Sequence, residues 1–198
     1  MKKHLIGVDE AGRGPLAGPV SVGTVLLFSQ SKLPLSGLKD SKKLSERQRE
    51  EWFARIRSWQ KEGKLQYAVS LVSHSVIDAK GISFAIRSGI ARNLKKLDVD
   101  PKFAEVLLDG SLKAPQEYTC QKTIIKGDEK IPVISLASIV AKVTRDRAMK
   151  RLGKKYPQYG FEIHKGYGTL SHRKMIQKYG PCEIHRKTFL RNFDSKSF

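Results

Sequence analysis

Cysteine is scarce in this sequence. The 198 residues include only two, Cys120 and Cys182, which are too few for a disulfide framework or for a zinc site with the usual cysteine and histidine spacing. The composition therefore excludes a small secreted scaffold held by disulfides and a structural zinc fold. We expect both cysteines to be reduced thiols, and we expect the protein to work in the cytoplasm.

Long hydrophobic runs are missing as well. No stretch approaches the roughly 18 apolar residues that a membrane-spanning helix needs. The Met1-Lys2-Lys3 start is followed by only a short apolar run, so we expect no signal peptide and no membrane partner. Apolar residues still make up 39% of the chain, which is enough for the core of one domain.

Acidic residues are few relative to basic ones. Thirty-eight Lys and Arg stand against nineteen Asp and Glu, giving a formal charge of +19, and the excess is concentrated in residues 142–198. Such a field attracts polyanions and raises their encounter rate. Because no basic amphipathic anchor for an anionic membrane is evident, the charge favours nucleic acid as the partner.

Hydrophobic periodicity predicts strands that alternate with helices. A good N-cap at Ser45, with Gln48 completing a capping box, begins the first helix, and Ser75 and Asp78 are expected to cap a short turn. The predicted strands cover 4–9, 19–28, 64–72, 103–109 and 119–125, and the predicted helices cover 46–61, 82–97, 135–153 and about 170–178.

This alternation predicts an α/β fold with a central mixed sheet flanked by helices, because the opening strand pair reads as an antiparallel hairpin. We expect residues 1–153 to form the core. Residues 154–198 should be a basic helical extension that packs on the core within a single domain, since 45 residues alone bury little apolar surface.

Four carboxylates are candidates for chemistry: Asp9, Glu10, Asp109 and Asp128. All except Glu10 end or closely follow an apolar strand, and ligands of open α/β sheets gather at strand ends, so Asp109 should lie beside Asp9. Neighbouring strand residues point to opposite faces. We therefore expect the chain to bend at Glu10, where the following glycines allow it, so that Glu10 joins Asp9.

Buried carboxylates need a compensating charge, and hard cations such as Mg²⁺ take oxygen ligands. Two metal ions roughly 3.5–4 Å apart can activate a water and stabilise the leaving oxygen in a phosphodiester displacement. The pattern therefore indicates a metal-dependent nuclease. The Gly12-Arg13-Gly14 turn leaves backbone N–H groups open to a phosphate or sugar, and Ser41, Lys42 and Lys43 form a loop that can meet phosphates.

These motifs resemble the type 2 ribonucleases H, and among them the bacterial ribonuclease HII family. The resemblance spans nearly the whole chain. It is carried by 9–14 (Asp-Glu-Ala-Gly-Arg-Gly), 40–44 (Asp-Ser-Lys-Lys-Leu), Asp109-Gly110, Lys126-Gly127-Asp128, 135–146, 164–169 and 185–189.

The resemblance implies a ribonuclease H-like fold and endonucleolytic cleavage of the RNA strand of RNA–DNA hybrids. It also implies incision on the 5′ side of single ribonucleotides in duplex DNA, leaving 3′-hydroxyl and 5′-phosphate ends, with Mn²⁺ or Mg²⁺ as cofactor. Asp9, Glu10 and Asp109 would be metal ligands and Asp128 the fourth catalytic carboxylate. Asp146 is a rival for that place, but it lies mid-helix between Arg145 and Arg147, where an ion pair explains it.

The family likeness also assigns substrate contacts. The Gly12-Arg13-Gly14 backbone would read the 2′-hydroxyl, which alone distinguishes a ribonucleotide from its deoxy counterpart, and Tyr167 would stack near the next sugar. Ser41, Lys42 and Lys43 would grip phosphates. The histidines His164, His172 and His185 are expected to be structural or to contact phosphates.

Three alternatives remain open at the level of sequence. Ribonuclease HIII typically has Gly-Lys-Gly in place of Gly-Arg-Gly and an extra N-terminal domain, whereas residue 13 is Arg and the catalytic strand starts at His4. A resolvase or integrase of the same fold would cut DNA. A basic ribosomal or RNA-binding protein would explain the charge but not the carboxylates at strand ends. We expect a monomer, and a sliding clamp is a candidate partner.

Overall fold

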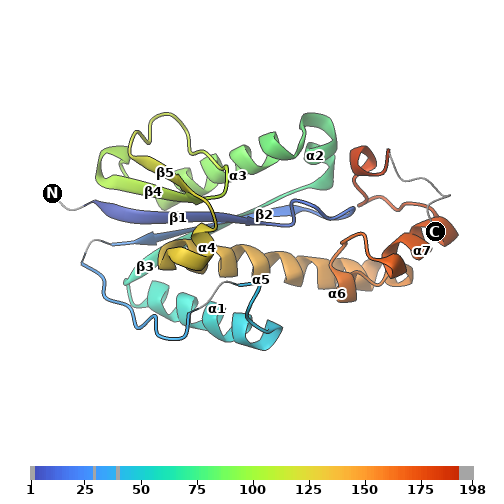
Figure 1. Ribbon diagram of the computed structural model, residues 1–198, viewed down its shortest axis with the longest axis horizontal. Coiled ribbons are helices and arrows are strands. Elements are labelled where there is room, and N and C mark those ends of the chain that lie inside the picture. The colour runs from blue at the N-terminus through green and yellow to red at the C-terminus, as the bar shows by residue number, and fades with distance from the viewer. Residues whose placement is uncertain (1–2, 29, 39–40, 192–198) are drawn as a thin grey trace.

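The computed structural model describes residues 3–28, 30–38 and 41–191. Its centre is one five-stranded sheet with the strand order β3-β2-β1-β4-β5 (Figure 1). The strands are β1 (His4–Ala11), β2 (Val20–Leu27), β3 (Leu65–Val72), β4 (Ala104–Asp109) and β5 (Gln121–Ile124).

The sheet is mixed, as the sequence predicts. β1 and β2 form the expected antiparallel hairpin, and β3 pairs antiparallel with β2. β4 lies parallel to β1 on its other side, and β5 continues the parallel half. The parallel register matches Val8 with Leu108, so the next residue of each strand is an aspartate, Asp9 on β1 and Asp109 on β4.

Helices cover both faces of the sheet (Figure 1). α3 packs on one face in an apolar cluster that includes Ile6, Val22 and Ile90. α1 and α5 pack on the other face in a second cluster that includes Trp52 and Leu136. The helices are α1 (Glu46–Lys61), α2 (His74–Lys80), α3 (Ile82–Leu97), α4 (Gly127–Lys130), α5 (Pro132–Lys155), α6 (Phe161–His164) and α7 (Leu170–Tyr179), with short 3-10 turns at Pro101–Phe103, Pro157–Tyr159 and Lys187–Phe189.

Local signals place most helix starts correctly, and the exceptions have physical reasons. The capping box of Ser45 and Gln48 is present. α5 begins at Pro132 rather than 135, because proline suits the first turn, where its missing N–H is not needed. The turn expected at Ser75 and Asp78 is a short helix capped by Ser73. Asp78 instead accepts hydrogen bonds from the backbone of residues 187 and 188.

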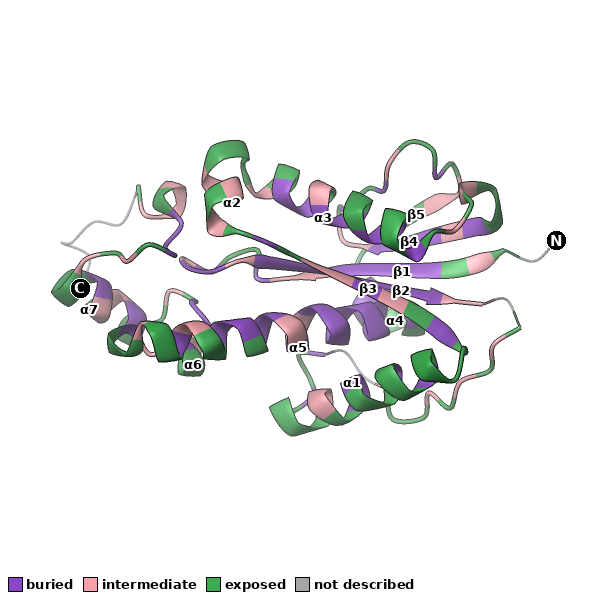
Figure 2. Ribbon diagram, turned by 180° about the vertical axis from the view of Figure 1, so that it is seen from behind, coloured by how far each residue is buried: buried purple, intermediate pink, exposed green. Residues whose placement is uncertain are grey.

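α5 lies unusually close to the sheet because two glycines remove side chains between them. A Cβ on Gly7 would be 2.2 Å from the carbonyl oxygen of Val133, and a Cβ on Gly23 would be 2.2 Å from that of Ala137. Most of the strand pair and much of α5 are buried (Figure 2). This close approach brings the polar side of α5 to the carboxyl end of β1.

The C-terminal part of the described chain packs at the far end of α5 (Figure 1). A third apolar cluster joins Phe161 and Ile176 of this part to Met149 of α5 and to Ala17 of the β1–β2 connection. The backbone of Ala17 also bridges to His185. The loop after the first carboxylates is therefore clamped by residues that lie far away in the sequence.

Two absences expected from the sequence can be checked in the described ranges. None of their helices combines the length and the apolar character needed to cross a membrane. Cys120 and Cys182 are both free thiols, as predicted.

Candidate active site

Three carboxylates from three elements meet at the carboxyl end of the parallel strands. Asp9 comes from β1, Asp109 ends β4, and Asp128 lies in α4 directly after β5. Each offers one oxygen, and the three oxygens lie within 4.8 Å of one another. Asp9 and Asp128 are buried, while Asp109 is partly exposed.

Burial makes this group unfavourable without a cation. Desolvation raises the pKa of Asp9 well above its usual value, and the charges of Glu10 and Asp109 raise it further, while the hydroxyl of Ser138 opposes the shift. Buried negative charges at this separation need a counter-charge, and an all-oxygen ligand set suits a hard divalent cation. The residues present therefore fit Mg²⁺ or Mn²⁺.

Glu10 stands apart from the three aspartates. The bend expected at Glu10 is wrong, because β1 continues through Ala11 and Glu10 pairs with Val22 in the sheet. Its carboxylate lies 3.5 Å from Nη1 of Arg13. Burial raises the pKa of Glu10, the charge of Arg13 lowers it, and the charge of Asp109 raises it. Glu10 is thus close enough to Asp109 for its pKa to respond to that charge, but its carboxylate pairs with Arg13.

Backbone and side-chain donors orient the other two aspartates. The N–H of Gly127 donates to Oδ1 of Asp109 at 2.7 Å, and Nζ of Lys42 donates to Oδ2 of Asp128 at 2.9 Å. Between them, Lys126 adopts a left-handed conformation with φ 55°, which turns the chain from β5 into α4. The turn is what brings Asp128 back towards the strand ends.

Asp146, the sequence-level rival of Asp128, does not join the three aspartates. Its Oδ1 accepts a hydrogen bond from Lys142 at 2.8 Å, and its Oδ2 lies 3.9 Å from Arg49. The sequence predicts an ion-pair role for Asp146, which the structure shows, but its partners are Lys142 and Arg49 and not the adjacent Arg145 and Arg147. Arg145 donates to backbone carbonyls, and Arg147 pairs with Glu50.

A cavity of about 240 Å³ opens over the carboxylates. It brings together most of the residues that the sequence singles out, together with two from α5, Ser138 and Lys142, that sequence reasoning did not assign to the site. The lining residues are Asp9, Glu10, Ala11, Gly12, Arg13, Gly14, Ser41, Lys42, Asp109, Ser138, Lys142 and Tyr167. The signal for the α5 pair was their spacing of four residues, which places both on one helix face.

The three residues of the predicted phosphate-binding loop lie in different environments. Ser41 is buried, and its hydroxyl forms a 2.7 Å hydrogen bond with the hydroxyl of Ser138. Lys42 is exposed and reaches Asp128, whereas Lys43 lies outside the cavity lining and pairs with Glu129 at 3.0 Å. Asp40, in the same motif, lies outside the described residues.

Two buried arginines hold the β1–β2 connection that contains the Gly12-Arg13-Gly14 turn. Arg186 donates to the carbonyl oxygens of Gly12 at 2.7 Å and Arg13 at 2.9 Å, as well as to Gly18. Arg145 donates to the carbonyl of Pro19 at 2.9 Å. Burial lowers the pKa of Arg186 to about 9, with the nearby charge of Arg145 adding to the shift.

This grip sets the direction of the turn's N–H groups. In a trans peptide unit the C=O and N–H bonds point in opposite directions. Because the carbonyls of Gly12 and Arg13 point at Arg186, the N–H groups of Arg13 and Gly14 point away from it. Neither N–H has a hydrogen-bond partner among residues 3–28, 30–38 and 41–191.

Tyr167 forms another wall of the cavity, and the residue is 43% exposed. The Arg145 guanidinium lies 5.7 Å from the ring centre. The backbone carbonyl of Tyr167 accepts a hydrogen bond from Nδ1 of His172, and Nε2 of His172 lies 3.1 Å from Nε2 of His185. Both histidines are fully buried, so they support the loop from inside.

Comparison with known proteins identifies the family to which this chain belongs. The family model described as Ribonuclease HII matches residues 6–192. The chain belongs to the ribonuclease HII family. A ribonuclease HII from Caldicellulosiruptor bescii is 46% identical over 190 residues, which cover 96% of this chain and 88% of the relative. The protein is therefore a ribonuclease, a hydrolase that acts on RNA.

Solved structures agree on the fold. Ribonuclease HII of Archaeoglobus fulgidus, solved in a PCNA complex, is 28% identical with a TM-score of 0.75, covering 92% of this chain and 93% of that one. Bst-RNase HIII, solved with Mn²⁺, is 17% identical with a TM-score of 0.64, covering 95% and 65%. At that identity the second likeness shows a shared ribonuclease H fold alone.

Proposed function

We propose that the protein is a metal-dependent endoribonuclease that cleaves the RNA strand of RNA–DNA hybrids and also incises duplex DNA on the 5′ side of a single embedded ribonucleotide. Membership of the ribonuclease HII family supports action on hybrids. The observation that carries the finer proposal is the shared cavity, in which Asp9 and Asp109 face the Gly12-Arg13-Gly14 turn and Tyr167.

Asp9, Asp109 and Asp128 would hold the metal, with Glu10 completing the ligand set from the Arg13 side. Bound divalent cations, Mg²⁺ or Mn²⁺, supply a water of lowered pKa and neutralise charge on the leaving oxygen. The chain's own contribution is to orient Asp9 through Ser138 and the N–H of Glu10, whose hydrogen bonds partly offset the burial that raises the pKa of Asp9. Lys42 and Lys142 add positive charge at the cavity wall.

Selection of ribonucleotides would follow from the backbone of the turn. The N–H groups of Arg13 and Gly14 point away from Arg186 and have no partner in the described ranges, so they are free to donate to a 2′-hydroxyl. A site whose polar groups are satisfied only by that hydroxyl rejects a deoxyribonucleotide strongly. The exposed ring of Tyr167 would stack on the neighbouring sugar.

The product ends follow from the nucleophile. If water attacks phosphorus on the 5′ side of the ribonucleotide, the cut leaves a 3′-hydroxyl and a 5′-phosphate. Attack by a 2′-hydroxyl would instead leave a 2′,3′-cyclic phosphate. In the proposed mechanism the 2′-hydroxyl is engaged by the Gly12-Arg13-Gly14 turn and serves for recognition.

One assay tests the proposal. Duplex DNA with one ribonucleotide, a full RNA–DNA hybrid and an all-DNA duplex are incubated with Mg²⁺, Mn²⁺ or chelator, and the cut is mapped with its end chemistry. We expect cutting of the first two substrates, on the 5′ side of the single ribonucleotide, and none with chelator. Equal cutting of the all-DNA duplex would favour a resolvase-like enzyme, and cyclic phosphate ends would contradict the mechanism.

The setting of the activity is also part of the proposal. A monomer acting in the cytoplasm, where bacterial DNA lies, would suffice, since one chain supplies all the site residues.

We further propose that residues 1–153 and 154–198 unfold together, because apolar contacts join them. A sliding clamp is a candidate partner, because the A. fulgidus relative was solved with PCNA. A pull-down with a purified clamp and the intact chain would test it.

A further inference from the structure

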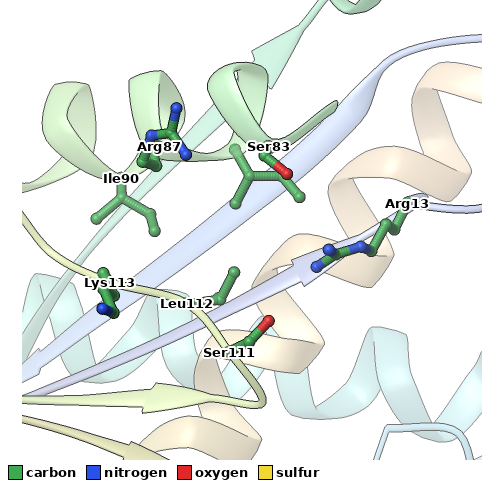
Figure 3. Close-up of a pocket in the computed structure, with 8 residues that line it drawn as sticks. Arg13, Ser83, Arg87, Ile90, Ser111, Leu112 and Lys113 are labelled. Atoms are coloured by element: carbon green, nitrogen blue, oxygen red, sulfur yellow. The ribbon is translucent and has the colours of Figure 1, made fainter. Parts of the chain in front are cut away.

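A second cavity lies next to the active site, on the other side of Arg13. It has a volume of about 310 Å³ and lies between α3 and the segment that follows β4 (Figure 3). Its polar lining consists of Arg13, Ser83, Arg87, Ser111 and Lys113. We propose that this cavity binds a backbone phosphodiester of the substrate duplex, outside the catalytic centre.

The lining has the chemistry of an anion site. Three side chains are cations, two carry hydroxyl donors, and no carboxylate lines the cavity. Arginine forms paired hydrogen bonds to phosphate oxygens, and serine and lysine add further donors. The cavity also lies beside the first turn of α3, whose N-terminus has no side-chain cap and adds a partial positive charge.

Arg13 pairs with Glu10, but the other two cations of this cavity differ from many basic side chains of the protein in having no internal partner. Lys43, Lys122 and Arg147 are each paired with a glutamate. By contrast, neither Arg87 nor Lys113 makes a hydrogen bond or ion pair with any part of the chain that the structure describes. A cation that is left unpaired beside a hollow is available for an external anion.

The cavity is built on rigid elements. Ile86 and Ile90 of α3 and Leu112 after β4 form its apolar base, and all three are buried in the core beneath the sheet face. Gly110 has a φ of +59°, which turns the chain after Asp109 so that Ser111 and Lys113 reach the cavity. The same short connection thus links the catalytic Asp109 to the proposed phosphate contacts.

The cavity shares lining residues with the active-site cavity and with a further surface hollow. Arg13 lines this cavity and the carboxylate cavity alike. On the opposite side, Arg87 and Lys113 also line a further hollow of about 370 Å³, where Phe84 is exposed. The arrangement therefore forms a basic track that leads away from the carboxylates, as a nucleic-acid backbone would require.

This inference rests on the proposed function, because it takes the ligand to be the nuclease's own duplex. It predicts that the track contributes binding and not chemistry. Loss of its cations should raise KM and the dissociation constant of the duplex, while kcat at saturating substrate stays near that of the parent protein.

The test compares Arg87→Ala/Lys113→Ala with the matched control Lys95→Ala/Lys102→Ala, which removes the same charge from exposed sites elsewhere. Binding of a duplex with one ribonucleotide is measured by fluorescence anisotropy in chelator, over a range of salt. We expect about 10-fold weaker binding at low salt and a salt slope reduced by about 0.9, the contribution of one phosphate contact. The control should keep the parent slope.

The inference would be overturned if both double variants lost the same affinity for the duplex, or if Arg87→Ala/Lys113→Ala kept the parent salt slope. Either result would mean that only the overall positive charge of the protein attracts the duplex. The charge-conserving variant Arg87→Lys/Lys113→Arg should keep the salt slope of the parent protein. Ser111→Glu, which removes no packing group, should weaken binding in the same direction. Because binding is measured without metal, a protein that binds through the track but never cuts would instead refute the proposed function.

Discussion

Nη2 of Arg186 donates a 2.7 Å hydrogen bond to the carbonyl oxygen of Gly12, across 174 positions of sequence. The guanidinium is fully buried, and its other donors reach Arg13 and Gly18. The last described part of the chain therefore sets the backbone direction of the turn beside the first carboxylates. This contact makes the C-terminal region part of the active-site architecture.

Replacing Arg186 with Lys should disturb both stability and recognition. Lysine carries its donors on a single nitrogen and cannot span the three carbonyls that the separate guanidinium nitrogens bind, so we expect a loss of about 3 kcal/mol in the free energy of unfolding. A turn displaced by a fraction of an ångström should lower kcat on a single-ribonucleotide duplex by about 100-fold. Urea unfolding and single-turnover kinetics measure the two effects. Lys187→Ala, at an exposed neighbour, should change neither quantity.

Asp9→Asn should abolish cleavage and at the same time stabilise the metal-free protein. The pKa of Asp9 is raised by burial, so its ionised form destabilises the folded state at neutral pH. Removing that charge should add about 1–2 kcal/mol, or a rise in Tm of about 2–8 °C in chelator. Asp98→Asn, at an exposed left-handed position that asparagine tolerates, should leave Tm and cleavage unchanged. A destabilised Asp9→Asn would contradict the account.

Asp109→Asn should separate catalysis from binding. The substituted side chain keeps an amide oxygen that can accept the Gly127 N–H, so the local fold should persist. Without the charge the metal cannot be held, and we expect cutting to fall below detection while the dissociation constant of a duplex changes by less than about threefold, or ~0.7 kcal/mol. Parallel loss of binding, measured by anisotropy, would indicate that Asp109 is mainly structural.

The histidine pair should make the fold sensitive to acid. Burial lowers the pKa of both His172 and His185 to about 4. His172 must donate from Nδ1 to the Tyr167 carbonyl, and His185 accepts at Nδ1 from the Cys182 N–H, so one proton is shared between their Nε2 atoms. A second proton there would set two N–H groups against each other.

The sign of the effect follows from linkage. The unfolded histidines bind protons near pH 6.5, whereas the folded ones resist until about pH 4. Stability is therefore complete above pH 6.5 and falls as the pH drops towards 4, by about 2 kcal/mol per histidine at pH 5. Urea unfolding at pH 7 and pH 5 measures it. His185→Gln keeps a donor for His172 and should show a smaller decline, and an equal decline would exclude the pair as its source.

Gly7→Ala should destabilise the protein through α5. The added methyl group would lie 2.2 Å from the Val133 carbonyl oxygen, which is far closer than packed atoms allow. Overpacking of this kind should cost about 3 kcal/mol, seen as a lower midpoint of urea unfolding. Gly14→Ala is the matched control, because nothing lies within 4 Å of its added methyl group. Equal losses for the two variants would argue against close helix–sheet packing as the cause.

The positions of the site aspartates could be predicted from the sequence, because they depend on short-range patterns. Asp9 and Asp109 each end an apolar strand, and parallel strands bring their ends together, so their proximity could be predicted. The preference for Asp128 over Asp146 rested on similar grounds, and only Asp128 joins the other two. The expected bend at Glu10 was wrong, because cross-strand pairing with Val22 keeps β1 extended.

The remaining features have no local signature. The hydroxyl of Ser41, expected to face phosphates, is bound to Ser138, 97 positions away. Arg145 and Arg186 read as two more cations in a basic region, yet both are buried and bind backbone carbonyls. Arg87 and Lys113 likewise carry no motif, and only folding places them around one cavity.

The amino-acid sequence by itself determined the kind of chemistry, since it supplies carboxylates at strand ends, an open glycine turn and a large positive charge. It also determined most helices and strands, because capping and apolar periodicity act within a few residues. Only the tertiary structure decided which charges are buried, which cations stay unpaired and which way the turn's N–H groups point. Desolvation and hydrogen-bond direction depend on the atoms that surround a group, and distant parts of the chain supply most of those atoms.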